Sequence, residues 1–450
     1  MHPNSVITRI PPSPTGHLHI GTTRTALFNY LFSKHHDGTM VFRSEDTDKA
    51  RSTTEYEKEI IEGLTWLGLA WDNDTIVRQS ERAPLYRQYL EKMIAAGTAY
   101  LSEEESKNVE GQMVTLVRLK NPNKVITFND LVRGDITFDT TELGDIIIAR
   151  SIDDALYHFT VVVDDHEMGV THVLRGDDHI SNTPRQILIQ EAIGVSRPIY
   201  AHLPLILATD RSKMSKRHGA VSLNEYRKAG FTKEAIINYL AMLGWNPGTD
   251  QELFTLEELV AAFKVEHIHK AGAVFDIKKF EWFNKQYLDK LTEEEFLTYI
   301  KQDFPVTLTE LPQFDEERFL KLLPTIRERV NTRGEFHHLT QAGEYDYFFD
   351  TPVYETEILQ WKNDDSVEAS LPRLQALVPL LETADFSSPE TIKAVIWSYA
   401  EETGRGEVLW PLRVALSGKK QSPDPFTLAF ILGSVETLLR LKTACGKIEG

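Results

Sequence analysis

The sequence predicts an α/β protein with a strand-rich insertion and a mainly helical second half. Three observations support this prediction. The first fifty residues alternate between strand and helix patterns, residues 101–150 contain short strand patterns without long helices, and helix patterns dominate from about residue 219. Alternation of strands and helices is typical of a parallel sheet covered by helices.

The N-terminal segment predicts a strand-helix-strand unit. A strand is expected over SVITRI, which is followed by the turn composition of PPSPTG. Leu27, Tyr30 and Leu31 recur at helical spacing, and this helix is expected to stop at Gly38. A second strand is expected over TMVFRSEDTD, and two further helices over TTEYEKEIIEGLTWLGL and APLYRQYLEKMIAAG, with Pro84 in the first turn of the latter.

The middle of the chain changes character and then returns to α/β alternation. Short strands are expected in VTLVRLK, KVITF, GDITF and GDIIIAR, which together resemble an inserted module. From about residue 157 the alternation resumes, with a helix near SNTPRQILIQEAIG and a strand in YAHLPLILATD. Beyond residue 220 helices dominate, and Thr255 and Glu258 have the spacing of a capping box.

Composition limits the class of protein. The chain has 450 residues, of which 41% are hydrophobic and 26% charged, as in ordinary globular proteins of about three domains. The single cysteine, Cys445, excludes an internal disulfide and a cysteine-cluster zinc site, so a reducing cytoplasm is expected. No apolar run reaches the roughly 18 residues that span a bilayer. The net charge of −18 argues against nonspecific nucleic-acid binding, although local basic patches can still bind RNA.

The segment PPSPTGHLHIGT, residues 11–22, places a Pro/Gly turn before a helix. Backbone N–H groups and the positive end of a helix dipole form an anion site at such a position. Gly16 and Gly21 permit close approach of a ligand, and His17 and His19 lie beside them. Taken alone, this pattern is more often merely a turn.

A second segment, RSKMSKRHG at residues 211–219, concentrates positive charge on an acidic chain. Lys213 and Lys216 can follow a phosphate chain as point charges, and His19 can donate a hydrogen bond to an oxygen that gains charge during reaction. A basic loop alone is usually a solvated surface. The two segments together indicate a site for a phosphate chain.

These segments carry a resemblance to a known family. HLHIGT and KMSKR resemble the HIGH and KMSKS signatures of class I aminoacyl-tRNA synthetases. The longer stretches PSPTGHLHIG, RSEDTD, VVVDDHEMGVTHVLRGDDHISNTPRQ and KMSKRHGAVSL are similar to bacterial glutamyl-tRNA synthetases, in the same order. Through LAMLGWNPG, LLPTIRERV and VLWPLRVALSG the resemblance covers nearly the whole chain.

The resemblance implies an α/β Rossmann-type catalytic domain with an inserted α+β acceptor-binding module, followed by mainly α-helical stem-contact and anticodon-binding domains. The two halves of the catalytic domain are expected at residues 1–88 and 157–218, the second half with the KMSKR loop. The inserted module is expected at 89–156, the stem-contact domain at 219–300 and the anticodon-binding domain at 301–450.

The activity implied is ATP-dependent attachment of glutamate to the 3′ end of tRNA(Glu) through a glutamyl-adenylate, with release of AMP and pyrophosphate. A second candidate acceptor is tRNA(Gln). Mg²⁺ is expected to arrive with ATP rather than in a protein-built cage. No zinc is expected, because the insertion is brief and free of cysteine. A cytoplasmic monomer without membrane contact is expected.

Site residues follow by matching positions. The residues expected to be catalytic are His19, Lys213 and Lys216, and those expected to bind ATP are Thr15, Gly16, His19, Gly21, Lys213, Lys216 and Arg217. No protein residue is expected to bind a metal. The residues expected to contact tRNA are Asp46, Asp48, Arg327, Arg329 and Arg333, with a charged helix face as an equal alternative for the three arginines.

The amino-acid pocket is expected to contain fixed cations, because the planar guanidinium fork matches a γ-carboxylate. Arg9 and Arg175 match the arginines that contact the substrate side chain in the family. Glu45 matches the acid that holds the α-amino group, and Ser13 and Tyr157 match polar pocket residues.

A purely structural role is an alternative for each of these side chains. Arg9 or Arg175 could pair with a structural carboxylate such as Asp46 or Asp177. Glu45 could belong to a solvated acidic turn, and Tyr157 could be ordinary core.

The chain departs from the family pattern at Thr22, Arg217 and Asp177, where the signatures commonly show His, Ser and Glu. A glutaminyl-tRNA synthetase is the nearest rival, but it usually reads Glu-Pro-Asn-Gly where this chain has SPTG. A noncatalytic tRNA-binding paralogue is the alternative from another class, and the presence of His19, Lys213 and Lys216 argues against it.

Overall fold

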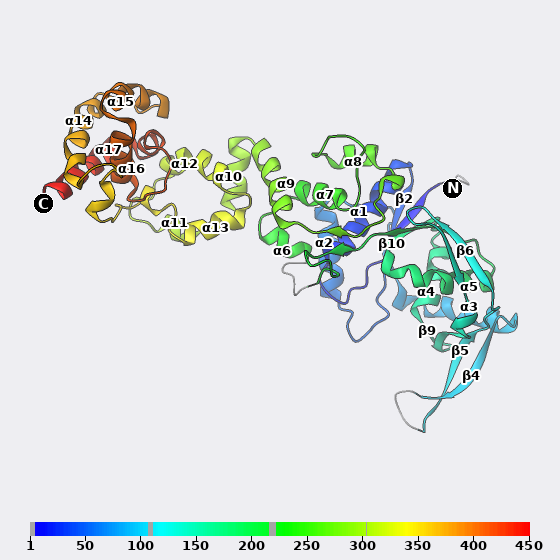
Figure 1. Ribbon diagram of the computed structural model, residues 1–450. Helices are drawn as coiled ribbons and strands as arrows, with labels where there is room; N and C mark the ends of the chain where they lie inside the picture. The colour runs from blue at the N-terminus through cyan, green and yellow to red at the C-terminus, as the bar shows by residue number, and fades with distance from the viewer. Residues whose placement is uncertain (1–4, 107–110, 216–221, 303) are drawn as a thin grey trace. The chain divides into compact units, whose positions relative to one another are not determined.

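The computed structural model divides the chain into two compact units, residues 1–287 and 288–450 (Figure 1). The strands among the described residues lie in the first unit, and the described residues of the second form helices and turns. This arrangement confirms the expected α/β region followed by a helical one. The division falls within α9 (Ile277–Lys290). The residues described are 5–106, 111–215, 222–302 and 304–450.

The predicted strand-helix-strand unit is present at the start of the chain. β1 (Ile7–Ile10) and β2 (Thr39–Ser44) pair in parallel, and α1 (Ile20–His35) connects them. β1 is buried along its whole length, as is typical of a parallel strand covered on both faces. Leu27 of α1 is fully buried in the core against this sheet. β3 (Val77–Arg78) extends the sheet beside β2.

A second group of strands continues this layer. β10 (His172–Gly176) and β11 (Ile199–Leu203) pair in parallel. β10 begins beside β1, where the backbone N–H of Thr171 donates to the carbonyl of Ile7 at 3.0 Å. α4 (Tyr157–Glu167) precedes β10. The two halves of the α/β region therefore lie side by side although a long segment separates them in the chain.

The strand-rich segment is joined to this layer. The antiparallel hairpin of β6 (Val125–Asp130) and β7 (Gly134–Asp139) extends the sheet, because Asp130 pairs with Tyr200 of β11. The other strands form a four-stranded antiparallel sheet, and Val117 of that sheet shares one core with the helices around it. These strands are β4 (Ala99–Glu105), β5 (Met113–Leu119), β8 (Ile146–Ser151) and β9 (Asp154–Ala155), and the helices are α3 (Ala83–Ala95), α4 and α5 (Thr183–Ile193).

Helices cover the rest of the first unit. The capping box predicted for Thr255 and Glu258 is present, since each side chain accepts the backbone N–H of the other residue. The remaining elements are α2 (Thr54–Trp66), β12 (Ile206–Leu207), α6 (Leu223–Lys228), α7 (Lys233–Met242), α8 (Leu256–Ala262) and β13 (Ala273–Val274).

The second unit has its own hydrophobic core, which includes Phe319, Phe336, Leu374 and Leu412. Its last helix changes direction at Gly433, whose φ of 77° is outside the helical range. The helices are α10 (Glu293–Lys301), α11 (Val306–Thr309), α12 (Glu316–Arg329), α13 (Arg333–Gln341), α14 (Ser370–Glu382), α15 (Pro389–Thr403), α16 (Arg405–Ser417) and α17 (Pro425–Glu449).

Gly38 allows the chain to pass close to β1 after α1 ends. A Cβ atom added there would lie 2.2 Å from the carbonyl oxygen of Val6, which also accepts the N–H of Thr39. We therefore expect Gly38→Ala to lower the free energy of unfolding by about 1–3 kcal/mol, measured by urea denaturation. Gly446→Ala in α17, where no atom lies within 4 Å of the added Cβ, is the control and should cause no loss. Equal stability of the two variants would contradict the close approach at Gly38.

Candidate active site

A cavity of about 560 Å³ opens at the turn between β1 and α1. This volume lies within the range of about 300–1,000 Å³ typical of small-ligand pockets. The cavity is bordered by the turn, by Glu45 after β2, by the start of α4, by the end of β10 and by residues 205–214. Most residues predicted for ATP and glutamate line it, namely Arg9, Ser13, Thr15, Gly16, His19, Gly21, Glu45, Tyr157, Arg175 and Lys213.

His19 occupies the N-cap position of α1. Its Nδ1 accepts the backbone N–H of Gly21 at 3.0 Å. A neutral imidazole whose Nδ1 accepts a hydrogen bond carries its proton on Nε2. His19 therefore presents a donor Nε2–H at a helix N-terminus, where negative charge is stabilised.

Lys213 lies at the border of the cavity and forms an ion pair with Asp178. Its Nζ is 2.8 Å from Asp178 Oδ2, and the lysine side chain is 63% exposed. Burial raises the pKa of Asp178, but the hydrogen bond and charge of Lys213 outweigh this and hold it below its usual range. An exposed pair of this kind is weak, so a phosphate can compete for the ammonium group. Lys216 and Arg217 lie outside the described residues.

Arg9 and Arg175 are both buried but have different partners. The Nε of Arg9 lies 3.4 Å from Asp165 Oδ1, and its Nη1 donates to the carbonyl of Leu174. Arg175 donates to neutral acceptors, and no described carboxylate forms an ion pair with it. The carboxylates suggested as structural partners are otherwise engaged: Asp46 accepts from Ser80, and Asp177 pairs with Arg133 at 2.6 Å.

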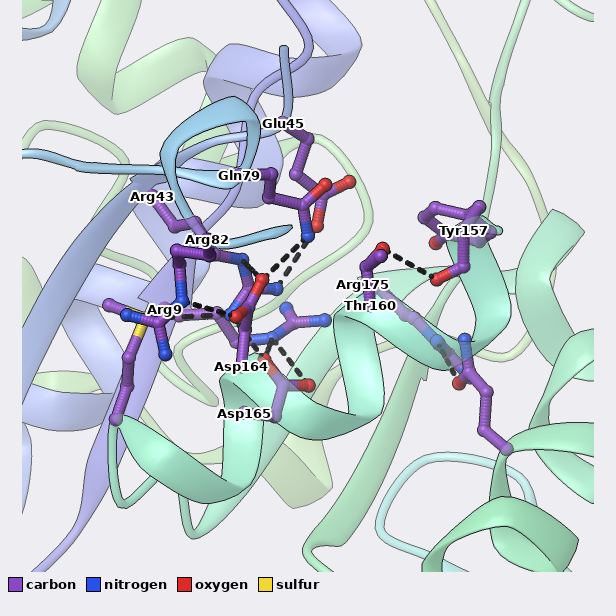
Figure 2. Close-up of polar contacts among 12 residues, drawn as sticks. Arg9, Arg43, Glu45, Gln79, Arg82, Tyr157, Thr160, Asp164, Asp165 and Arg175 are labelled. Atoms are coloured by element: carbon purple, nitrogen blue, oxygen red, sulfur yellow. Dashed lines mark hydrogen bonds and ion pairs between the residues drawn. The ribbon is translucent and has the colours of Figure 1, made fainter. Parts of the chain in front are cut away.

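A buried ion cluster lies beside the cavity (Figure 2). Arg43 is fully buried and lies 2.8 Å from Asp165, 3.0 Å from Glu45 and 3.8 Å from Asp164. Although burial opposes a charged guanidinium, these carboxylates raise the pKa of Arg43. Asp164 is held at 2.7–2.8 Å by three further donors, Gln79, Arg82 and Tyr86.

Glu45 connects this cluster to the cavity. It is 8% exposed, lines the cavity and accepts from Arg43. Burial holds its pKa above the usual value in spite of the nearby Arg43 and Arg9. Tyr157 also lines the cavity, and its hydroxyl lies 3.4 Å from Nδ1 of His179. Burial raises the pKa of Tyr157 to about 12.

The residues predicted to contact tRNA all have protein partners. Asp46 and Asp48 do not line the cavity, and Asp48 pairs with the exposed Arg51. In the second unit the three predicted arginines bind nearby groups: Arg327 donates to the carbonyls of Leu291 and Thr292, Arg329 pairs with Glu344, and Arg333 donates to Gln302. Their contact with tRNA stays a prediction.

The sequence did not single out four residues that the structure places at or beside the cavity. Asp178 and His179 lie three and four residues after Arg175, and Arg24 of α1 also lines the cavity. Arg43, the first residue of RSEDTD, lies in the buried cluster beside the cavity. The only available signal was their adjacency to motif residues, because a buried arginine and an exposed one look alike in a sequence.

No three His, Cys, Asp or Glu side chains in the described ranges are grouped so that they could hold a metal ion. Within the same ranges, no helix is both long and apolar enough to cross a membrane.

Comparison with known families identifies the class of protein. Residues 5–115 and 101–282 match the family model described as the catalytic domain of class I tRNA synthetases (E and Q). Residues 285–445 match the model described as an anticodon binding domain. The parallel sheet, the cavity between the two motif segments and these matches place the chain among the class I tRNA synthetases.

Individual relatives identify the family more closely. The chain is 39% identical to the glutamate–tRNA ligase of Thermodesulfovibrio yellowstonii, over 96% of this chain and 98% of that protein. It is 38% identical to that of Syntrophobacter fumaroxidans, over 99% and 98%. The crystal structure of a glutamate tRNA ligase from Elizabethkingia meningosepticum in complex with its amino acid is 30% identical, with a TM-score of 0.86 and coverage of 98% and 99%. The chain belongs to the glutamate–tRNA ligase family.

The buried cluster predicts a large effect of removing its central cation. Arg43→Met would leave Asp165, Glu45 and Asp164 buried without their shared partner, and we expect a loss of about 3–5 kcal/mol in the free energy of unfolding. Arg51→Ala, which breaks an ion pair whose arginine is 74% exposed, is the control and should cost less than about 1 kcal/mol. Urea denaturation of both variants measures the difference.

The Arg43→Met loss should also depend on pH. Burial raises the pKa of Asp165, but Arg9 and Arg43 outweigh it and hold the pKa below its ordinary value. Asp165 therefore stabilises the fold above its unfolded pKa, and this contribution disappears as the pH falls. The difference between wild type and variant should shrink below about pH 4. A difference that stays constant with pH would contradict the assigned role of the carboxylates.

Proposed function

We propose that this chain activates L-glutamate with ATP to glutamyl-adenylate and transfers the glutamyl group to the 3′ end of tRNA(Glu). The observation that carries the proposal is that a single cavity is lined by His19, Lys213 and Arg175. These residues supply a hydrogen-bond donor at a helix N-terminus, a cation that can bind a phosphate, and a buried guanidinium that no described carboxylate pairs with.

The nucleotide half of the cavity suits phosphoryl transfer. Attack of the glutamate α-carboxylate on the α-phosphate of ATP spreads negative charge over phosphoryl oxygens, and pyrophosphate leaves. His19 Nε2–H donates to one of these oxygens, and Lys213 and Lys216 neutralise the leaving phosphates. Thr15, Gly16, Gly21 and Arg217 would border the same nucleotide. No covalent enzyme intermediate is needed.

The amino-acid half suits an acidic substrate. Arg175, supported by Arg9, binds the γ-carboxylate, and Glu45 binds the α-ammonium group. Ser13 and Tyr157 supply polar contacts. The terminal ribose hydroxyl of tRNA then attacks the activated carbonyl, and AMP leaves.

Mg²⁺ would arrive with ATP. The cavity carboxylates Glu45 and Asp178 already have cationic partners, so the ion would be held mainly by phosphate oxygens and water. When bound, it neutralises phosphate charge. We further propose that the chain acts as a cytoplasmic monomer and that tRNA(Gln) is a second candidate acceptor.

The function is tested by ATP–pyrophosphate exchange with purified protein and tRNA(Glu) transcript. Exchange should require glutamate, and glutamine should not replace it. Charging of tRNA(Glu) and tRNA(Gln) transcripts then identifies the acceptor. Glutamine-dependent exchange would favour a glutaminyl enzyme, and the absence of exchange with either amino acid would favour a noncatalytic paralogue.

Lys213 should affect mainly the rate at which glutamate is activated with ATP. We expect Lys213→Ala to lower the exchange rate about tenfold to a hundredfold while the KM for glutamate changes little, because its phosphate contact strengthens toward the transition state. Lys233→Ala, at the exposed start of α7, removes a similar charge outside the cavity and should leave the rate unchanged. A normal rate in Lys213→Ala would remove this residue from the catalytic set. Lys216→Ala is expected to act in the same direction.

A further inference from the structure

Arg175 is held by three neutral acceptors. Its Nε donates to Nε2 of His202 at 3.2 Å, its Nη1 to Oε1 of Gln186 at 2.7 Å, and its Nη2 to Oγ1 of Thr183 at 2.7 Å. A guanidinium has five N–H donors, so two are left for a ligand in the cavity that Arg175 lines. We call Thr183, Gln186 and His202 the neutral acceptor set.

The orientation of His202 is itself fixed. His202 is fully buried, and its Nδ1 lies 2.6 Å from Oδ2 of Asp130, which also accepts the His202 backbone N–H. Nδ1 must therefore carry the proton of the neutral ring, which leaves the lone pair of Nε2 to accept from Arg175. Burial keeps the pKa of His202 below its ordinary value, although Asp130 opposes this.

The contrast with Arg9 shows what the neutral acceptor set does. Arg9 already forms an ion pair with Asp165, whereas no described carboxylate forms one with Arg175. A buried guanidinium without a counter-charge is costly, and burial lowers the pKa of Arg175. An incoming carboxylate removes this cost, and a neutral amide does not.

We propose that the neutral acceptor set determines specificity by orienting Arg175 without neutralising it, so that an acidic substrate is preferred over its amide. The inference rests on the proposed function, in which Arg175 binds the γ-carboxylate of glutamate. Gln186 is the decisive member, because Glu at this position has almost the same shape and would place a carboxylate directly on Nη1.

Gln186→Glu tests the proposal. The new carboxylate should compete with substrate for Arg175, and we expect the KM for glutamate to rise about tenfold to a hundredfold. The rate at saturating glutamate and the KM for ATP should stay near wild type. The ratio of kcat/KM for glutamate to that for glutamine should fall. All values come from tRNA-dependent ATP–pyrophosphate exchange.

Gln190→Glu is the matched control. Gln190 lies one turn further along α5, is 4% exposed and donates to the hydroxyl of Tyr200 rather than accepting from Arg175. The same chemical change there should leave the KM for glutamate within about twofold of wild type. An equal rise in both variants, or normal glutamate saturation in Gln186→Glu, would overturn the proposal.

Gln186→Met decides the question if Gln186→Glu does not fold, as judged by thermal unfolding. It removes one acceptor without adding charge, so the KM for glutamate should rise by about threefold to tenfold while glutamate remains preferred. An unchanged KM in Gln186→Met would overturn the proposal. Failure of the wild-type protein to activate glutamate would instead refute the proposed function.

Discussion

The buried contact of Arg43 with Asp164, Asp165 and Glu45 is the interaction on which the geometry of the cavity depends. Arg43 and Glu45 come from β2 and the residue just after it, before the inserted segment, and the two aspartates come from α4, after it. Asp165 also holds Arg9 on β1. One ion cluster thus connects three elements and fixes two cavity side chains, Glu45 and Arg9. Such clusters contribute specific geometry more than net stability, because desolvation offsets much of the attraction between the charges.

The cavity contains positively charged groups although the chain has a net charge of −18. Anionic ligands are attracted over short distances by Arg175, Lys213 and the N-terminus of α1, while the net negative charge of the chain opposes the approach of polyanions from a distance. The three cationic side chains of the cavity also have different partners. Lys213 forms an ion pair with the exposed Asp178, and Arg9 forms one with the buried Asp165. Arg175 donates hydrogen bonds to neutral partners. Lys213 can therefore exchange its exposed partner for a ligand, whereas Arg9 stays held by a buried carboxylate.

Much of this arrangement could be predicted from local sequence. The helical spacing of Leu27 and Leu31, the capping box of Thr255 and Glu258, and the glycine turn before His19 act over a few residues, and the structure contains all three features. The motif segments also indicated one nucleotide site, and Lys213 does line the same cavity as His19.

What the sequence could not provide is pairing between distant residues. Nothing local shows that Asp130 pairs with Tyr200, or that Arg43 is fully buried while Arg51 is exposed. The partners of Arg175 were equally hidden, because hydrogen-bond geometry depends on how β10, β11 and α5 pack. The strand pattern of residues 101–150 was correctly recognised, yet its hairpin turned out to be part of the parallel layer.

The attachment of hairpin β6–β7 to β11 limits how this protein can be rearranged. A chain cut at residues 89 and 156 would lose the carboxylate that orients His202 and would leave β11 with an open edge, available for pairing with another molecule. The inserted segment therefore cannot be removed without exposing β11 and leaving His202 without its carboxylate partner.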